Sequence, residues 1–159
     1  MRASLGAGVL LAVLVSGCGP KVDLAKGLEV VVVSSGWFDA GMVSGQNKIV
    51  PSVTFKLKNM SDQRLKALHT NAVFRQLESP DEWGSQFSIV RGSDGLGPGE
   101  TTDNITLRSL NGYTSAAPRA EFFTNKQFVD AKAELFAKYS SVQWKRIGDV
   151  TIERRLITN

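Results

Sequence analysis

Cysteine and histidine are almost absent from this sequence. Its 159 residues include one cysteine, Cys18, and one histidine, His69. A single cysteine cannot form a disulfide within the chain, and zinc and copper sites ordinarily need several His or Cys ligands. We therefore expect no metal and no cofactor, and we interpret His69 as a structural residue.

Signatures of catalysis and of phosphate binding are also lacking. The sequence has no Gly-x-Ser-x-Gly elbow of the kind that presents a serine nucleophile. Its glycine-rich stretch GSDGLGPG lacks the Gly-Lys-Ser/Thr of a phosphate-binding loop. The carboxylate pairs Asp81–Glu82 and Asp94–Glu100 lie in turn-like stretches, with few further oxygens for a calcium ion. We predict that the protein is not an enzyme and has no catalytic residues.

Charge of one sign is in small excess. The chain has 19 Lys and Arg against 15 Asp and Glu, with a formal net charge of +4. Charges of both signs are interspersed, which is typical of an ordinary protein surface and argues against a nucleic-acid partner.

The sequence has no apolar run long enough to span a membrane comfortably, and its longest uncharged apolar segment is short. Residues 3–17 are uncharged and follow Arg2. About 15 residues are too few for a comfortable membrane span, which needs roughly 20. A positive start, a short apolar core and small residues at its end predict a secretory signal peptide. The alternative, a buried N-terminal helix or strand, lacks an amphipathic pattern.

The end of this segment, Val15-Ser16-Gly17-Cys18, resembles the lipobox of bacterial lipoproteins. The resemblance implies cleavage between Gly17 and Cys18 and attachment of acyl chains to Cys18, which would anchor the protein to a membrane. Residue 19 is glycine rather than aspartate, which, by the same resemblance, indicates the outer membrane of the bacterial envelope, on its periplasmic side. The alternative role for Cys18 is an intermolecular disulfide.

We therefore divide the chain into a signal peptide (1–17), a lipidated tether (18–27) and a β-sandwich domain (28–159). A fully extended tether of ten residues reaches at most ~35 Å. The domain is expected to stay near its membrane.

Short apolar runs separated by turns predict an all-β domain. We expect strands at 28–35, 52–59, 87–92 and 101–109, a glycine-containing loop after residue 35, and a loop at 112–123 that leads into a short extended segment. Residues 64–77 fit a strand and a helix about equally well. We choose a strand over a helix for the segment 125–139, because its neighbours are predicted strands.

At the C-terminus we predict a hairpin with a three-residue loop from Ile147 to Asp149 and a bulge near Gly148. This register would place Trp144, together with Val142, Val150, Ile152 and Leu156, on one face that packs in the core.

The stretches VTFKLKNMSDQRLKAL and LGPGETTDNITL resemble the Ig-like and fibronectin-like sandwiches of bacterial envelope proteins, including the FxLyD-type lipoprotein modules. In those modules a strand ending in Lys-Asn-x-Ser turns into the next strand, and a Pro-Gly-Glu turn precedes a later one. The resemblance implies a single antiparallel Ig-like β-sandwich and no particular activity.

Two groups of residues are candidates for binding. Trp37 and Trp83 stand in loop-like contexts, where they either anchor a protein or glycan partner or cap the core. A cluster of basic residues would form an edge facing lipid or peptidoglycan, or would block edge-to-edge aggregation: Lys145, Arg146, Arg154 and Arg155.

We conclude that the sequence predicts a membrane-anchored, non-catalytic module that binds or scaffolds another envelope component, either a protein or a glycan. The alternative is a carrier or sensor of a small lipid or glycan. A carrier needs an apolar cavity of several hundred Å³, whereas a scaffold has a filled core and an exposed patch.

Overall fold

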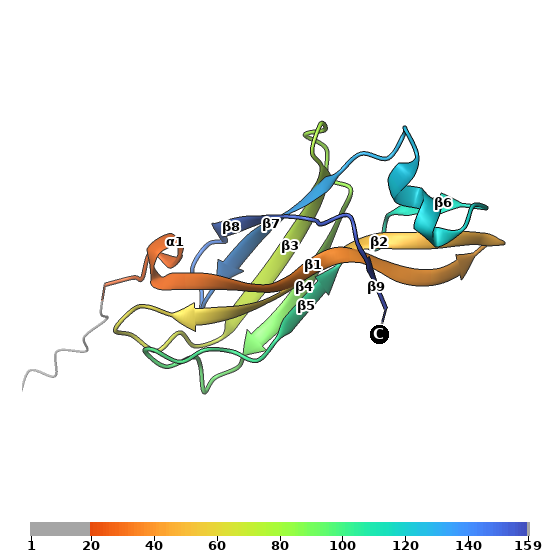
Figure 1. Cartoon of the computed structure of the whole chain (residues 1–159). Coiled ribbons are helices and arrows are strands. Elements are labelled where there is room, and N and C mark those ends of the chain that lie inside the picture. Colours follow the sequence, from red (N-terminus) through yellow and green to blue (C-terminus); the bar gives the residue numbers. More distant parts are fainter. Residues whose placement is uncertain (1–19, 159) are drawn as a thin grey trace, which may run out of the picture.

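The computed structural model describes residues 20–158 and shows two β-sheets that share one hydrophobic core (Figure 1). The predicted signal peptide and Cys18 lie outside the described residues. Among residues 20–158, no helix is long and apolar enough to cross a membrane. The prediction of an all-β fold with two sheets is confirmed.

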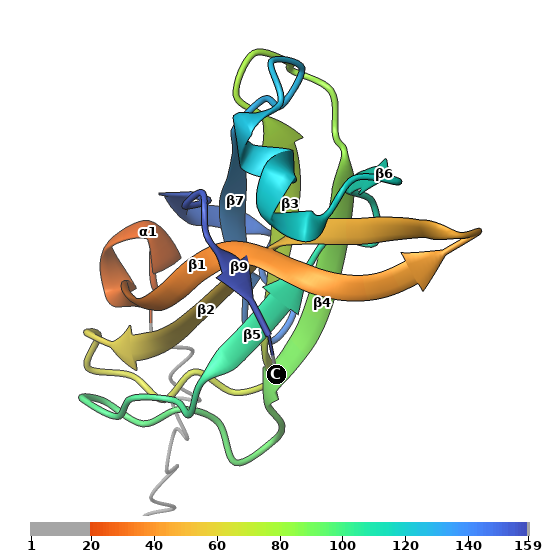
Figure 2. The same cartoon turned by 45° about the vertical axis from the view of Figure 1, so that its right-hand side comes forward.

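A long hairpin forms the centre of the first sheet. β1 (Leu28–Val43) pairs with β2 (Gln46–Asn59) along their whole lengths, apart from two bulges. The turn between them consists of Ser44 and Gly45, which both have positive φ (49° and 77°), as a type I′ turn requires. The far part of the hairpin projects beyond the rest of the fold (Figure 2). The prediction of a loop after residue 35 is wrong, because β1 continues through Gly36 to Val43.

Three short strands complete the first sheet. β5 (Ile105–Arg108) and β6 (Tyr113–Ser115) pair with β2, and β9 (Leu156–Ile157) pairs with β1 in parallel. The order is therefore β5-β2-β1-β9, with β6 beside the far part of β2.

The second sheet has four antiparallel strands in the order β4-β3-β7-β8. These are β3 (Leu68–Gln76), β4 (Gly84–Arg91), β7 (Ala131–Lys138) and β8 (Lys145–Thr151). The strand chosen for the segment 125–139 is confirmed for its second half, and the segment left open at 64–77 contains a strand. In β7 every second residue points into the core, and all four of these residues are fully buried: Ala131, Ala133, Leu135 and Ala137.

Side chains from both sheets fill the space between them. Trp37, Phe55 and Phe74 are fully buried, and Leu57, Leu107 and Leu135 surround them. These side chains form one contiguous hydrophobic core between the sheets.

The two motifs that suggested an envelope sandwich meet in space. The Asn59 N–H donates to the carbonyl of Glu100, and the Gly99 N–H donates to the carbonyl of Asn59. The Asn59 side chain is fully buried and donates to the carbonyls of Gln63 and Leu96. Asn59 therefore joins the end of β2 to the glycine-rich loop, which explains why turn residues recur at both places.

The C-terminal hairpin prediction is wrong. Gly148 lies within β8, opposite Leu135, and Arg146 lies opposite Phe136, so that Ile147 is the extra residue of a bulge. The bulge near Gly148 is confirmed, but β8 continues through it instead of turning.

Two short helices stand where the sequence predicts a loop and a tether. Residues 119–124, within the expected loop and extended segment, form the 3₁₀ helix η1 (Arg119–Thr124), which starts after Pro118. The helix α1 (Leu24–Gly27) lies in the expected tether, and its Leu24 is buried in the core. The folded region therefore begins before residue 28.

Candidate binding surfaces

The first two candidate tryptophans belong to a cluster of rings at the base of the hairpin. Trp37 is 0% exposed and Trp83 is half-buried against the same core. Their ring centroids are 6.0 Å apart, and Phe128 and Tyr113 lie 4.8 and 5.5 Å from Trp37. The prediction that Trp37 lies on a loop is wrong, and its burial leaves it no surface for a partner.

Trp144, which was expected in the core, is the most exposed of the three tryptophans, with 40% of its surface accessible. It stands just before β8, on the outer face of the second sheet. Phe87 and Ile89 of β4 are also exposed there. We call the group formed by these three exposed residues and two half-buried neighbours, His69 and Lys138, the aromatic patch: His69, Phe87, Ile89, Lys138 and Trp144.

Contacts between the rings hold the aromatic patch together. The Phe87 ring lies edge-on to His69 at 5.4 Å and to Trp144 at 6.2 Å, with interplanar angles of 82° and 85°. The Lys138 ammonium lies 5.1 Å from the Trp144 ring centre, within cation–π range. Because the rings are nearly perpendicular, they do not form the flat platform that stacks on a sugar ring.

Strand pairing explains how these residues meet. His69 is paired with Ile89 on one side and with Lys138 on the other, so all three project from the same face. The Nδ1 atom of His69 is buried and has no hydrogen-bond partner. A structural histidine is expected to form hydrogen bonds with its buried ring nitrogens, and the Nδ1 atom of His69 does not meet this expectation.

The chain enters the fold beside the aromatic patch. The Val22 N–H donates to the Tyr139 hydroxyl at 2.7 Å, and the Lys145 Nζ lies 3.9 Å from an Asp23 carboxylate oxygen. A surface pocket of about 200 Å³ is formed jointly by residues 22–24 and 142–145, and these include Trp144. We call this end of the molecule the tether pole.

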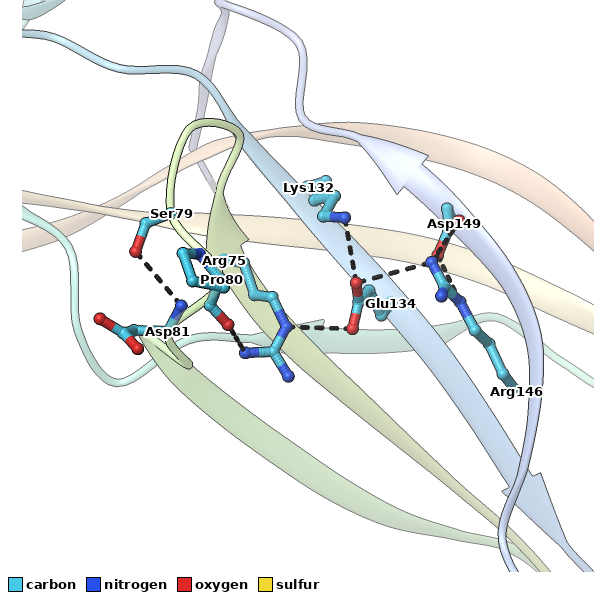
Figure 3. A network of polar contacts seen from close by, with 8 residues as sticks. All are labelled: Arg75, Ser79, Pro80, Asp81, Lys132, Glu134, Arg146 and Asp149. Atoms are coloured by element: carbon cyan, nitrogen blue, oxygen red, sulfur yellow. Dashed lines mark hydrogen bonds and ion pairs between the residues drawn. The ribbon is translucent and has the colours of Figure 1, made fainter.

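The rest of the same sheet face carries a network of charges around Glu134 (Figure 3). The Glu134 side chain is only 11% exposed. Its two oxygens lie 3.0 Å from Arg75 Nε and 3.0 Å from Lys132 Nζ, and Arg146 approaches to 3.5 Å. Arg146 also forms an ion pair with Asp149.

This network controls the protonation of Glu134. Burial acts to raise the pKa of Glu134, but hydrogen bonds from Lys132 and Arg75 and the positive charges of Lys132 and Arg146 outweigh it, so the pKa is lowered. The hydrogen bonds to Asp149 raise the pKa of Arg146. The network is internally satisfied, which is the expected state of a structural ion cluster.

A second apolar surface lies on the far part of the β1–β2 hairpin. We call this part of the hairpin, on both sides of the turn at Ser44 and Gly45, the arm. A shallow groove of about 360 Å³ runs between the arm and the segment after β5. Val43 and Leu110 line it and are exposed, Leu110 to 79%. Met42, next to Val43, is 66% exposed. The charged lining residues are both cationic: Lys48 and Arg108.

The four basic candidates do not form one edge. Lys145 and Arg146 begin β8, whereas Arg154 and Arg155 follow its other end. Arg154 forms an ion pair with Asp130 at 2.7 Å, and hydrogen bonds to Asp130 raise its pKa. The Arg155 Nε donates to the Ser35 carbonyl at 2.8 Å. Arg154 and Arg155 therefore hold the C-terminal segment against the fold.

Glu100, one of the carboxylates considered for chemistry, takes a structural role. Glu100 accepts a hydrogen bond from the Gly97 N–H and lies 3.9 Å from Arg64. Within residues 20–158 no group of three or more His, Cys, Asp or Glu side chains is arranged to hold a metal ion.

Comparisons with known proteins identify no family for this chain. No protein-family model matches the chain, and no curated protein matches it. A solved structure described as the X-ray structure of Northeast Structural Genomics Consortium target SoR45 superimposes with a TM-score of 0.46 and 14% sequence identity, covering 81% of this chain and 88% of that chain.

Proposed function

We propose that the protein is a lipid-anchored, non-catalytic module of the bacterial cell envelope that binds another envelope protein through the groove of its arm. The observation that carries the proposal is the apolar groove with its exposed lining residues Val43 and Leu110. Exposed apolar patches of this kind, bordered by polar groups, typically mark interaction sites.

The anchor is proposed at Cys18, on the outer membrane and facing the periplasm. In support, the chain is held against the domain at Val22, whose N–H donates to Tyr139, and already at Pro20, whose carbonyl accepts a hydrogen bond from Gln63 Nε2 at 2.8 Å. Three residues (19–21) lie between Cys18 and Val22, so the four steps from one Cα to the next reach at most about 14 Å. A tether this short would hold the domain directly above the bilayer.

The domain is proposed to be Ig-like. The order β5-β2-β1 in one sheet and β4-β3-β7-β8 in the other matches the E-B-A and C′-C-F-G pairings of a fibronectin-like sandwich, if β1 is taken as strand A. β6 and β9 are additions at the edges of the first sheet.

The chemistry of the groove indicates its partner. Lys48 and Arg108 supply positive charge beside an apolar floor that includes Phe38 and Val50. The matching partner is a protein segment that inserts an apolar side chain and has acidic residues next to it. Apolar contacts at the centre of the groove would supply most of the affinity. The charges of Lys48 and Arg108 would orient the partner segment.

The filled interior supports binding at the surface over the alternative of a carrier. A carrier would hold its lipid or glycan between the sheets, where Phe55, Phe74 and Trp37 occupy the space. The structural roles of Glu100 and Glu134 support the absence of catalysis.

Site-specific photocrosslinking in living cells tests the proposed partner. A photoreactive amino acid replaces Val43 in the groove or, as a control, Leu77 in a distant turn; the two have matched exposure, 45% and 47%. We expect a discrete crosslinked product from position 43 only. Mass spectrometry should place the crosslink in an apolar segment that contains acidic residues.

Leu110→Asp is the variant that should weaken partner binding in the groove. Leu110 is mostly exposed, so the substitution should not disturb folding, but it removes apolar contact and repels an acidic partner. Loss of the crosslink from position 43 is expected. Equal crosslinks from positions 43 and 77, or a product that survives Leu110→Asp, would contradict the proposal. The anchor is checked separately, by the mass of acyl chains on Cys18.

A further inference from the structure

We propose that the aromatic patch docks on the surface of the membrane that carries the anchor, with anionic phospholipid as its ligand. This inference rests on the proposed lipid at Cys18. It assigns a site that is distinct from the groove of the arm, and it fixes how the domain is oriented on the bilayer.

The first argument is proximity. Trp144 shares a surface pocket with Val22 and Asp23, where the chain enters the fold. With a free tether of at most about 14 Å, the side of the domain that bears Trp144 faces the bilayer at close range. The effective concentration of lipid at the aromatic patch is therefore high without any added affinity.

The second argument is the chemistry of the side chains. Tryptophan is enriched at membrane interfaces, because its ring is apolar and its N–H reaches water. Phe87 and Ile89 extend the apolar surface around Trp144, and Ile89 is 64% exposed. The near-perpendicular rings offer edges and methyl groups, which fit between lipid chains better than they stack on a sugar.

The third argument is charge. Lysines gather at the tether pole: Lys21, Lys26, Lys66, Lys138 and Lys145. Lys66 is placed there by its carbonyl, which accepts a hydrogen bond from the Ser140 N–H. Acidic residues near these lysines in the sequence are Asp23, which lies near Lys145, Glu29 and Asp62. The excess of positive charge favours anionic headgroups.

Docking of the aromatic patch on the bilayer would also determine the direction in which the arm points. The first described residues and α1 lie at one end of the molecule, and the tip of the arm lies at the other (Figure 1). A bilayer at the tether pole would leave Met42 and Leu110 free to reach a partner away from the membrane.

Fluorescence quenching by brominated lipids tests the docking. The full chain is made by cell-free synthesis without membranes and is coupled through Cys18, its only cysteine, to vesicles that contain a maleimide lipid and phosphatidylglycerol. Attachment is then guaranteed even if Cys18 is not acylated in cells. Failure of the docking and failure of the proposed anchor are thus separate results.

We expect lipids brominated near the headgroup to quench the tryptophan emission of the wild type, and Trp144→Phe to abolish this quenching. Trp37 is fully buried and Trp83 is packed against it, so neither should respond. In the Trp144→Phe background, Met42→Trp serves as the control: a tryptophan on the arm should not be quenched.

The lysines are tested with uncoupled protein. Lys138→Gln and Lys145→Gln should each weaken binding to phosphatidylglycerol vesicles about fivefold at low salt. Equal quenching in wild type and Trp144→Phe, or quenching of the tryptophan at position 42, would overturn the proposal. So would iodide access to Trp144 that coupling to the vesicle leaves unchanged, because a protein partner would then be the better occupant.

Discussion

The outer face of the β4-β3-β7-β8 sheet is divided into two halves with opposite properties. In one half, Glu134 is surrounded by Arg75, Lys132 and Arg146. In the other half, Phe87 and its neighbours are exposed, and one histidine nitrogen has no partner. β3 and β7 contribute residues to both halves, so the strands alone do not account for the difference.

The difference shows which surface is complete without a partner. A carboxylate with three cations around it gains nothing further from a ligand, so the charged half is best explained by stability. Exposed apolar side chains are stabilised when a partner covers them, so the aromatic patch is the half that is suited to contact. Four predictions sharpen this comparison.

Glu134→Gln is expected to have the largest effect. It leaves three cations around a neutral side chain and should lower the free energy of unfolding by about 1–2 kcal/mol, since these cations can still reach water. Urea unfolding measures the change. Glu153→Gln, at a carboxylate that is 65% exposed, is the control and should have almost no effect.

The stability of the wild type should fall in acid through Glu134. Because the pKa of Glu134 is lowered in the folded state, its stabilising contribution is fully present above the unfolded value and is lost as the pH falls through the folded value. The Tm values of the wild type and Glu134→Gln should therefore begin to converge as the pH falls below about 4, the range of the unfolded value. Parallel curves of Tm against pH would contradict this role.

Within the charged half, Arg75→Gln should destabilise more than Arg146→Gln. Both contact Glu134, but the Arg75 side chain is more buried and closer, at 3.0 Å against 3.5 Å. Exposed ion pairs contribute little. Thermal unfolding of the two variants gives the order, and the reverse order would mean that the pair of Arg146 with Asp149 dominates.

Ile89→Thr should have the smallest effect on stability. It keeps a β-branched side chain in β4 and removes apolar surface that is exposed, so the free energy of unfolding should change by no more than about 0.5 kcal/mol. The same substitution should weaken vesicle docking. A loss of stability comparable to that of Glu134→Gln would place Ile89 in the fold and not in the aromatic patch.

Local patterns were sufficient to predict much of the fold. In β7, alanine and leucine alternate with Lys132, Glu134, Phe136 and Lys138, and this period of two residues is that of a strand with one buried face, in agreement with the strand chosen for this segment. The Gly148–Asp149 pair misled the prediction, because glycine marks bulges as well as turns. The helix α1 was missed because four residues carry no detectable period.

The binding surfaces could not be predicted from local pattern. Trp37 stands next to glycine and looks like a loop residue, yet the pairing of β1 with β2 buries it. Trp144 follows an alternating pattern, yet it projects from the outer face. The aromatic patch joins residues 69, 87, 138 and 144, and only the register of four strands brings them together.

The most direct test of the whole account is the labelling of two introduced cysteines in the acylated protein, purified and reconstituted in vesicles. Ile89→Cys and Met42→Cys replace side chains of nearly equal exposure, 64% and 66%, and acylation leaves each as the only free thiol. We predict that a membrane-impermeant maleimide labels position 42 rapidly and position 89 slowly. Equal rates at the two positions would contradict a domain that rests on its membrane and presents its arm to a partner.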